Sequence, residues 1–114
     1  MAVLKVAKLG NPILRQVARQ LDLKELADPK GELQKFIDDM IDTMRQKGGV
    51  GLPAPQVNRS IQVVVLEVEN NERYPGEAPI PVTALVNPVL SDFSEETVLG
   101  WESCLSLIDF RGLV

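Results

Sequence analysis

Two segments of the chain carry residue types and spacings that could do chemistry. The first runs from Gly49 to Gln56 and reads Gly-Val-Gly-Leu-Pro-Ala-Pro-Gln. Its glycines let the backbone approach a ligand closely, and its prolines stiffen the segment, so that Gln56 would be held in one direction. A rigid loop that ends in a carboxamide donor can form half of an oxyanion hole. The alternative is a helix end followed by a stiff connection, and spacing alone favours this alternative by about two to one.

The second segment surrounds the only cysteine, Cys104, and reads Gly-Trp-Glu-Ser-Cys-Leu-Ser-Leu over residues 100–107. A thiolate can act as a nucleophile or a metal ligand, but both roles normally need a histidine or another ligand nearby. The chain contains no histidine, and catalytic zinc sites usually have three protein ligands. Taken alone, Cys104 is therefore predicted to be buried and inert, as most free cysteines are.

The composition indicates a single domain, residues 1–114, whose apolar content of 45% is ample for a core. The charge is mildly acidic, with 12 basic and 16 acidic residues and no basic cluster, which argues against a nucleic-acid partner. No apolar run reaches the roughly 18–20 residues that span a bilayer, and we find no secretory signal, so no membrane association is expected. A single cysteine, which cannot form an intramolecular disulfide, favours a reducing, cytoplasmic location.

The elements that must position these two segments are helices first and strands afterwards. Asn11-Pro12 begins a predicted helix over about 12–20, and residues 28–31 form a turn. A second helix follows, because apolar residues recur at helical spacing from Leu33 to Met44, and Gly48-Gly49 ends it.

The rest of the chain is rich in β-branched and aliphatic residues. Strands are predicted over 61–68, 83–89 and 93–99, with an exposed loop over 69–81. This order predicts an α+β fold in which two N-terminal helices pack on a largely antiparallel sheet.

Together, the Gly49–Gln56 segment and the later Glu-Ser-Cys-Leu-Ser segment resemble the peptide deformylase family. The resemblance extends to residues 9–15, 86–88 and 110–114, and thus covers essentially the whole chain. It implies a peptide-deformylase-like fold and the removal of the formyl group from the N-terminal methionine of nascent polypeptides. It also implies a divalent metal cofactor, Fe2+ or Zn2+, and formyl-methionyl peptides or nascent chains as partners.

The resemblance assigns roles to particular residues. Cys104 matches a metal ligand. The Gln56 carboxamide and the Leu105 backbone N–H match the two donors to the formyl oxygen. Substrate-binding roles fall on four further residues: Gly49, Val50, Gly51 and Arg111.

One family motif has no counterpart in this sequence. The family's third motif, His-Glu-x-x-His on a C-terminal helix, supplies two metal ligands and the general base. We therefore expect a C-terminally truncated member without the metal-binding helix, in which the metal is absent or weakly bound and the activity is weak or absent. Three hypotheses stay open: a truncated, inactive deformylase; a short protein that shares ligands between chains; and a non-catalytic module whose groove binds peptides or a partner.

The missing helix also carries a prediction about assembly. Without it, an apolar strip along the sheet and the inner faces of both helices would be exposed. Apolar patches of more than a few hundred Å² usually bind a partner. A homo-oligomer that covers this face is therefore predicted.

Overall fold

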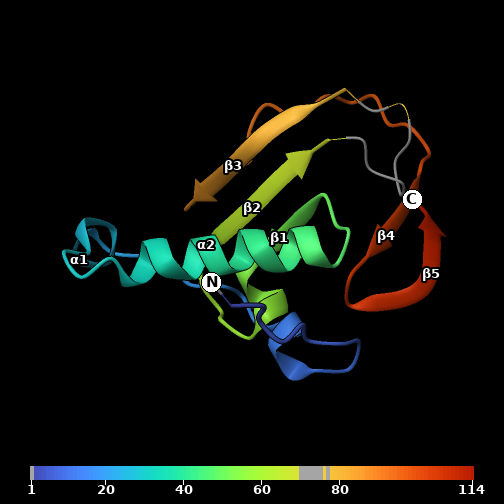
Figure 1. Cartoon of the computed structure of the whole chain (residues 1–114). Helices are drawn as coiled ribbons and strands as arrows, with labels where there is room; N and C mark the ends of the chain where they lie inside the picture. Colours follow the sequence, from blue (N-terminus) through green and yellow to red (C-terminus); the bar gives the residue numbers. More distant parts are fainter. Residues whose placement is uncertain (1, 70–75, 77) are drawn as a thin grey trace.

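The computed structural model describes residues 2–69, 76 and 78–114 (Figure 1). Helical elements come first and most strands later, so the predicted α+β class is confirmed. The elements, in order, are η1 (Pro12–Arg15), α1 (Leu23–Ala27), α2 (Glu32–Gln46), β1 (Gly51–Pro53), η2 (Ala54–Val57), β2 (Val63–Val68), β3 (Ile80–Val86), β4 (Trp101–Cys104) and β5 (Leu107–Leu113).

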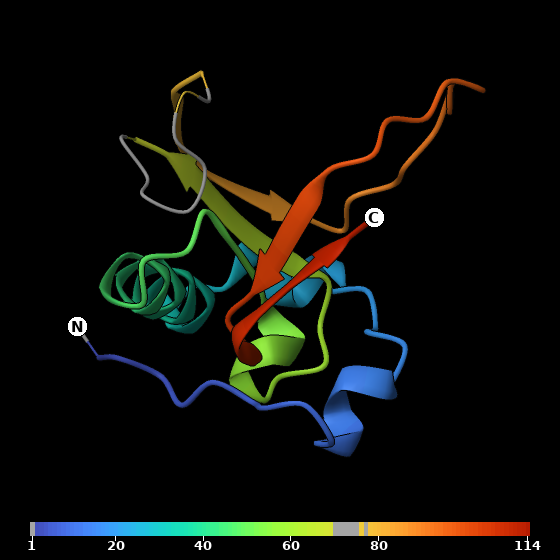
Figure 2. The same ribbon diagram turned by 90° about the vertical axis from the view of Figure 1, so that its right-hand side faces the viewer.

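The described strands form two antiparallel sheets. One sheet has the order β1-β2-β3, with Leu52 opposite Val65 and Val64 opposite Leu85. The other is the β4-β5 hairpin, which lies in front of the larger sheet in Figure 2. The segment between β3 and β4 reaches away from both sheets in the same view. The prediction of antiparallel pairing is confirmed, although the strands divide between two sheets.

Helix α2 packs its apolar face on β1 and β2 to form the core. Phe36, Ile37, Met40 and Met44 are buried on this face. They meet three fully buried residues of the strands: Leu52, Val63 and Val65. The helix ends at Gln46, and Gly48, which follows the C-cap residue Lys47, has a φ of +71° that favours glycine. The second predicted helix and its glycine stop are confirmed, whereas the expectation that its inner face would be exposed is wrong.

The N-terminal segment, residues 2–9, runs beside α2 and then toward the turn η2. The Ala2 N–H donates to Asp39 Oδ1 at 2.9 Å, and the Leu4 N–H donates to Thr43 Oγ1 at 2.8 Å. This backbone is thus tied to polar side chains of α2, which explains why Asp39 and Thr43 are buried in an otherwise apolar interior.

The helix predicted over about 12–20 is much shorter, because only η1 forms there. Asn11 caps it as predicted, since its side chain accepts from the Ile13 N–H. Beyond η1 the backbone pairs elsewhere: the Arg19 N–H donates to the Ser60 carbonyl, and the Arg19 carbonyl accepts from the Gln62 N–H. These long-range bonds replace the helical ones, and the apolar side chain of Val17, in the middle of the predicted helix, is 94% exposed.

The short helix α1 was not predicted. It begins with a capping box, in which Asp22 accepts from the Glu25 N–H and the Glu25 side chain accepts from the Asp22 N–H. The Asp-x-x-Glu pattern at 22–25 is a readable signal for this helix start. It is easily missed because only five residues follow the cap.

The later strands differ from the predicted ones. Strand β2 confirms the strand at 61–68, while β3 begins and ends three residues before the predicted 83–89 strand. Asn87 ends β3: it has a φ of +49°, and its side chain bonds the Leu21 N–H and carbonyl, both at 2.9 Å. Of the predicted loop over 69–81, residues 70–75 and 77 lie outside the described residues, and 80–81 belong to β3.

The strand predicted over 93–99 is wrong. These residues are exposed and form no strand, and the chain instead forms the hairpin of β4 and β5 around a turn at Leu105-Ser106. A local hairpin needs only a short turn, whereas residues 93–99 have no partner strand within the described part of the chain. Large exposed apolar side chains gather on β3, on this segment and on the hairpin: Ile80, Val82, Leu85, Val89, Leu90, Phe93, Val98, Leu99, Trp101, Ile108, Phe110 and Leu113.

Among the residues described, no helix is both long enough and apolar enough to cross a membrane.

Candidate functional site

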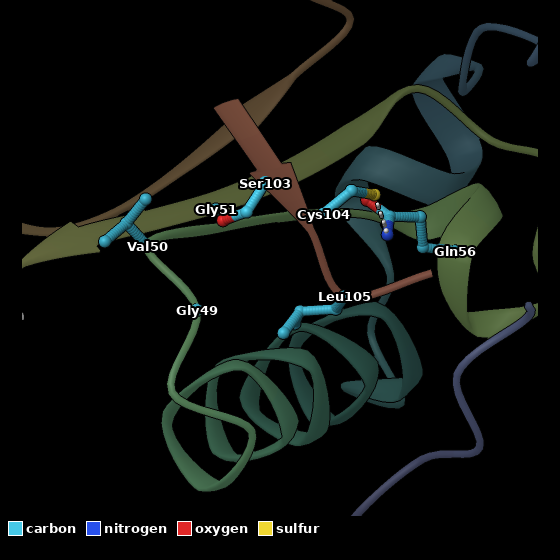
Figure 3. A pocket seen from close by; sticks show the side chains of 7 residues that line it. All are labelled: Gly49, Val50, Gly51, Gln56, Ser103, Cys104 and Leu105. Atoms are coloured by element: carbon cyan, nitrogen blue, oxygen red, sulfur yellow. Dashed lines mark hydrogen bonds between the residues drawn. The ribbon is translucent and has the colours of Figure 1, made fainter. Parts of the chain in front are cut away.

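A pocket of about 70 Å³ lies where the end of α2, strand β1, turn η2 and the β4-β5 hairpin come together (Figure 3). It brings together almost all of the residues singled out in the sequence, although the two segments are about fifty positions apart. Its lining consists of Gly49, Val50, Gly51, Gln56, Ser103, Cys104 and Leu105.

Turn η2 holds Gln56 at the edge of the core. Ala54 and Val57 on this turn are buried, and Asn58 ends it with a φ of +67°. The Gln56 carbonyl accepts a hydrogen bond of 2.7 Å from the Ala7 N–H of the N-terminal segment. The backbone of Gln56 is therefore fixed on both sides, and its side chain turns toward the hairpin (Figure 3).

The Gln56 carboxamide makes two hydrogen bonds within the site. Its Nε2 donates to Cys104 Sγ at 3.2 Å and to Ser106 Oγ at 2.9 Å. Cys104 is half-buried rather than fully buried, and its sulfur lies against a polar donor (Figure 3). The expectation of a fully buried cysteine is therefore wrong, and its inertness stays a prediction.

Ser106 was not among the predicted site residues. It is 7% exposed and lies in the turn of the hairpin, two residues after Cys104. A serine in a turn is normally read as a surface residue. The sequence signal was its place as the last residue of the Glu-Ser-Cys-Leu-Ser motif, but only the tertiary contact shows that it bonds Gln56.

The Leu105 side chain packs the hairpin turn against residues 49–51, the glycine segment. Its side chain is buried and belongs to the core. A Cβ added to Gly49 would lie 2.9 Å from Leu105 Cδ1, so any larger residue at position 49 would force the Leu105 side chain to shift. Within the part of the chain that the structure describes, the Leu105 backbone N–H has no hydrogen-bond acceptor.

An ion pair supports the other side of the glycine segment. Arg45 Nε donates to Glu67 Oε1 and Nη2 donates to Oε2, both at 2.8 Å, and this guanidinium lowers the pKa of Glu67. The Glu67 N–H in turn donates to the Val50 carbonyl at 2.9 Å. This support links α2, β2 and the pocket, and it was not predicted.

Arg111, predicted to bind substrate, lies outside the lining of the pocket. It is exposed on β5, directly opposite Ser103 of β4. The structure therefore places it one strand away from the residues that surround Cys104, and its role stays a prediction.

The residues present do not fit a catalytic metal centre by themselves. The sequence has no histidine, and no cluster of three or more His, Cys, Asp or Glu side chains suited to a metal occurs among the described residues. Cys104 is the one soft ligand in the pocket. A catalytic zinc site usually takes three protein ligands, and the lining of this pocket contains a single thiol.

Comparison with known proteins agrees with the motifs. The family model for polypeptide deformylase matches residues 3–114. Peptide deformylase 1 of Nitrosomonas europaea is 45% identical over 109 residues, which are 96% of this chain and 60% of that protein. The class I type b peptide deformylase of Acinetobacter baumannii, bound to K4U, has a TM-score of 0.92 and 38% identity over 100% of this chain and 70% of that one.

The same Acinetobacter baumannii enzyme with bound Met-Ala-Ser has a TM-score of 0.90 and 37% identity, covering 100% of this chain and 71% of that one. The chain therefore belongs to the peptide deformylase family, and the resemblance stated from its motifs is confirmed. It spans about 60% of the length of the curated relative from Nitrosomonas europaea. Members of this family are metal-dependent hydrolases.

Proposed function

We propose that this chain forms the substrate-binding part of a peptide deformylase site and holds the formyl end of a formyl-methionyl peptide. One observation carries the proposal: the Gln56 carboxamide nitrogen lies 3.2 Å from Cys104 Sγ, in a pocket that Leu105 also lines. The reaction of the family is the hydrolysis of the N-formyl group of a nascent polypeptide.

Two donors would bind the formyl oxygen. The Leu105 N–H has no acceptor within the described residues, and the Gln56 N–H that points to the sulfur is the second donor. Preorganised donors of this kind stabilise the charge that develops on a carbonyl oxygen, and removing one typically costs about 10²–10³ in kcat.

The peptide itself would extend along β1. This strand lies at the edge of its sheet in the order β1-β2-β3, so its outer side has no strand partner among the described residues. An extended peptide can add to such an edge through main-chain hydrogen bonds. Gly49, Val50 and Gly51 would then contact the first residues of the substrate, and we assign Arg111 to its downstream end.

Cys104 would contribute one thiolate to the metal on which the family depends. The remaining ligands and the general base are not supplied by the residues of this sequence, which has no histidine. We therefore propose that the 114 residues alone bind the metal weakly, if at all, and have weak or no activity.

The test is turnover and binding of formyl-Met-Ala-Ser by the purified chain under anaerobic conditions with Fe2+ or Ni2+, beside a Cys104→Ala control. We expect no turnover above the control, but chemical-shift changes at Gly49, Gly51 and Leu105 when the peptide is added. Turnover that the control abolishes would instead indicate ligands shared between chains. Absence of any shift changes at the pocket would contradict the proposed role in substrate binding.

The alternative function is a non-catalytic module that binds peptides or a partner protein in the same groove. The observation that favours it is a pocket whose lining, like the rest of the described residues, contains no group of three metal ligands. Comparing formyl-Met-Ala-Ser with Met-Ala-Ser separates the two functions. A deformylase site prefers the formylated peptide, and Gln56→Leu removes that preference. A general peptide groove binds both peptides equally.

We also propose that the chain forms a homo-oligomer that covers the exposed apolar side chains of the β4-β5 hairpin, such as Trp101 and Phe110, which are 62% and 71% exposed. Sedimentation velocity at high concentration tests this, and a clean monomer would contradict it. A cytoplasmic location, with no nucleic-acid or membrane partner, completes the proposal.

A further inference from the structure

The buried hydroxyl of Ser106 contacts the side chain that the proposed function makes a substrate donor. Ser106 Oγ accepts from Gln56 Nε2 at 2.9 Å, and the serine is 7% exposed. Gln56 and Ser106 are 50 residues apart in the sequence, so the contact depends entirely on the packing of turn η2 against the hairpin.

The two hydrogen bonds of the carboxamide differ in kind. A side-chain amide nitrogen has two hydrogens, and here one faces the Ser106 oxygen while the other faces Cys104 Sγ at 3.2 Å. Cys104 lines the pocket, whereas Ser106 is not part of the lining and is 7% exposed. When a carbonyl oxygen enters the pocket, the N–H at the sulfur is therefore the one that can change its acceptor, while the N–H at Ser106 holds the group in place.

The backbone fixes the relative position of the two residues independently of their side chains. The N-terminal segment donates from Ala7 N–H to the Gln56 carbonyl at 2.7 Å and from Leu9 N–H to the Ser106 carbonyl at 3.0 Å. Two residues of the N-terminal segment, Ala7 and Leu9, thus hold turn η2 and the hairpin turn together. The hydroxyl and the carboxamide are set at bonding distance before any ligand binds.

We infer that Ser106 is a positioning residue: it holds the Gln56 carboxamide so that one N–H stays directed toward Cys104. The inference rests on the proposed function, because the N–H held in this way is the one assigned to the formyl oxygen. Without the hydroxyl, the carboxamide would rotate among other orientations. Binding of formyl-Met-Ala-Ser would weaken by about three- to tenfold, as expected for the loss of one net hydrogen bond.

Side-chain amide spectra of the ¹⁵N-labelled full chain test this directly. The Gln56 cross-peaks are assigned by their absence in Gln56→Leu. In Ser106→Ala they should move toward the positions of exposed glutamines, and in Ser106→Thr, which keeps the hydroxyl, they should stay near those of the unmodified chain. Gln62 is the internal control, because its Nε2 is held by the Ala18 carbonyl at 3.0 Å, away from the hairpin.

Unchanged Gln56 cross-peaks in Ser106→Ala would overturn the inference, and so would equal shifts of Gln56 and Gln62, which indicate a general structural effect. If Ser106→Ala does not fold, Ser106→Cys provides a weaker acceptor of similar size and should give an intermediate shift. These spectra need no peptide. If the unmodified chain fails to bind formyl-Met-Ala-Ser, the proposed function fails, whereas the orientation of Gln56 is still decided by the cross-peaks.

Discussion

Thr43 offers a sharp test of how the N-terminal segment is held against α2. Its side chain is fully buried, accepts from the Leu4 N–H at 2.8 Å and donates to the Asp39 carbonyl at 2.7 Å. The same segment continues to Ala7, whose N–H bonds the carbonyl of Gln56. Loss of the Thr43 hydroxyl should therefore loosen the support of the pocket as well as lower stability.

The magnitude follows from replacing Thr43 with valine, which has nearly the same shape. The Leu4 N–H loses its acceptor, and a buried donor without a partner costs about 1–3 kcal/mol. The added methyl group returns at most about 0.8 kcal/mol. Because Leu4 is only partly buried, water satisfies part of the loss. We expect Thr43→Val to lower the free energy of unfolding by about 1–2 kcal/mol.

Urea unfolding followed by circular dichroism measures this change, with Thr97→Val as the matched control on an exposed threonine. The control should stay within about 0.5 kcal/mol of the unmodified chain. Amide exchange at Ala7 should accelerate in Thr43→Val and not in the control. A Thr43→Val protein that is as stable as the control would refute the reasoning, because the Leu4–Thr43 bond would then contribute nothing.

Three further predictions each concern a single residue. The guanidinium beside Glu25, followed by the N–H at the helix cap, lowers its pKa from 4.5 to about 2, so this carboxylate stabilises the fold above pH 4.5 and loses that effect as the pH falls toward 2. Glu25→Gln should therefore flatten the dependence of stability on pH in that window, and Glu95→Gln, on an exposed segment, should not. Gly49→Ala should cost about 1 kcal/mol in urea unfolding, since overpacking outweighs the gain from a stiffer unfolded chain. In a Leu105→Ala background that cost should vanish, and an unchanged cost would show that the 2.9 Å approach is not its cause. Asn87→Ala should be about 1 kcal/mol less stable than Asn87→Gly, because alanine tolerates the φ of +49° poorly; equal stabilities would contradict this reading of the strand end.

The elements that could be predicted from the sequence are those whose stability is local. Helix α2 combines an apolar face at helical spacing with a glycine stop, and both signals lie within its own residues. Strand β2 belongs to a nearly continuous run of β-branched and aliphatic residues, which suits a buried strand. In contrast, the helix expected over 12–20 did not form in full, because the backbone N–H and carbonyl of Arg19 bond residues 60 and 62 instead. Such long-range bonds leave no local pattern in the sequence.

The hairpin of β4 and β5 shows the same limit at the other end of the chain. Alternation of polar and apolar residues at 93–99 is typical of a strand, but a strand also needs a partner. Residues 101–104 instead pair with residues 107–113 across a short turn. Register and pairing depend on the turn and on packing, so alternation alone selected the wrong segment.

For the site, too, some features could be predicted from the sequence and others depend on the tertiary structure. The two motifs, their order and the absence of histidine are properties of the sequence, and the motifs were sufficient to identify the family. The contact of Gln56 with Cys104 and Ser106 belongs to the tertiary structure alone. It joins residues 48 and 50 positions apart, and it exists because turn η2 and the hairpin turn are both bonded to the N-terminal segment. Residue types can be read one by one, but a hydrogen bond requires two groups within about 3 Å, and only the folded chain sets that distance.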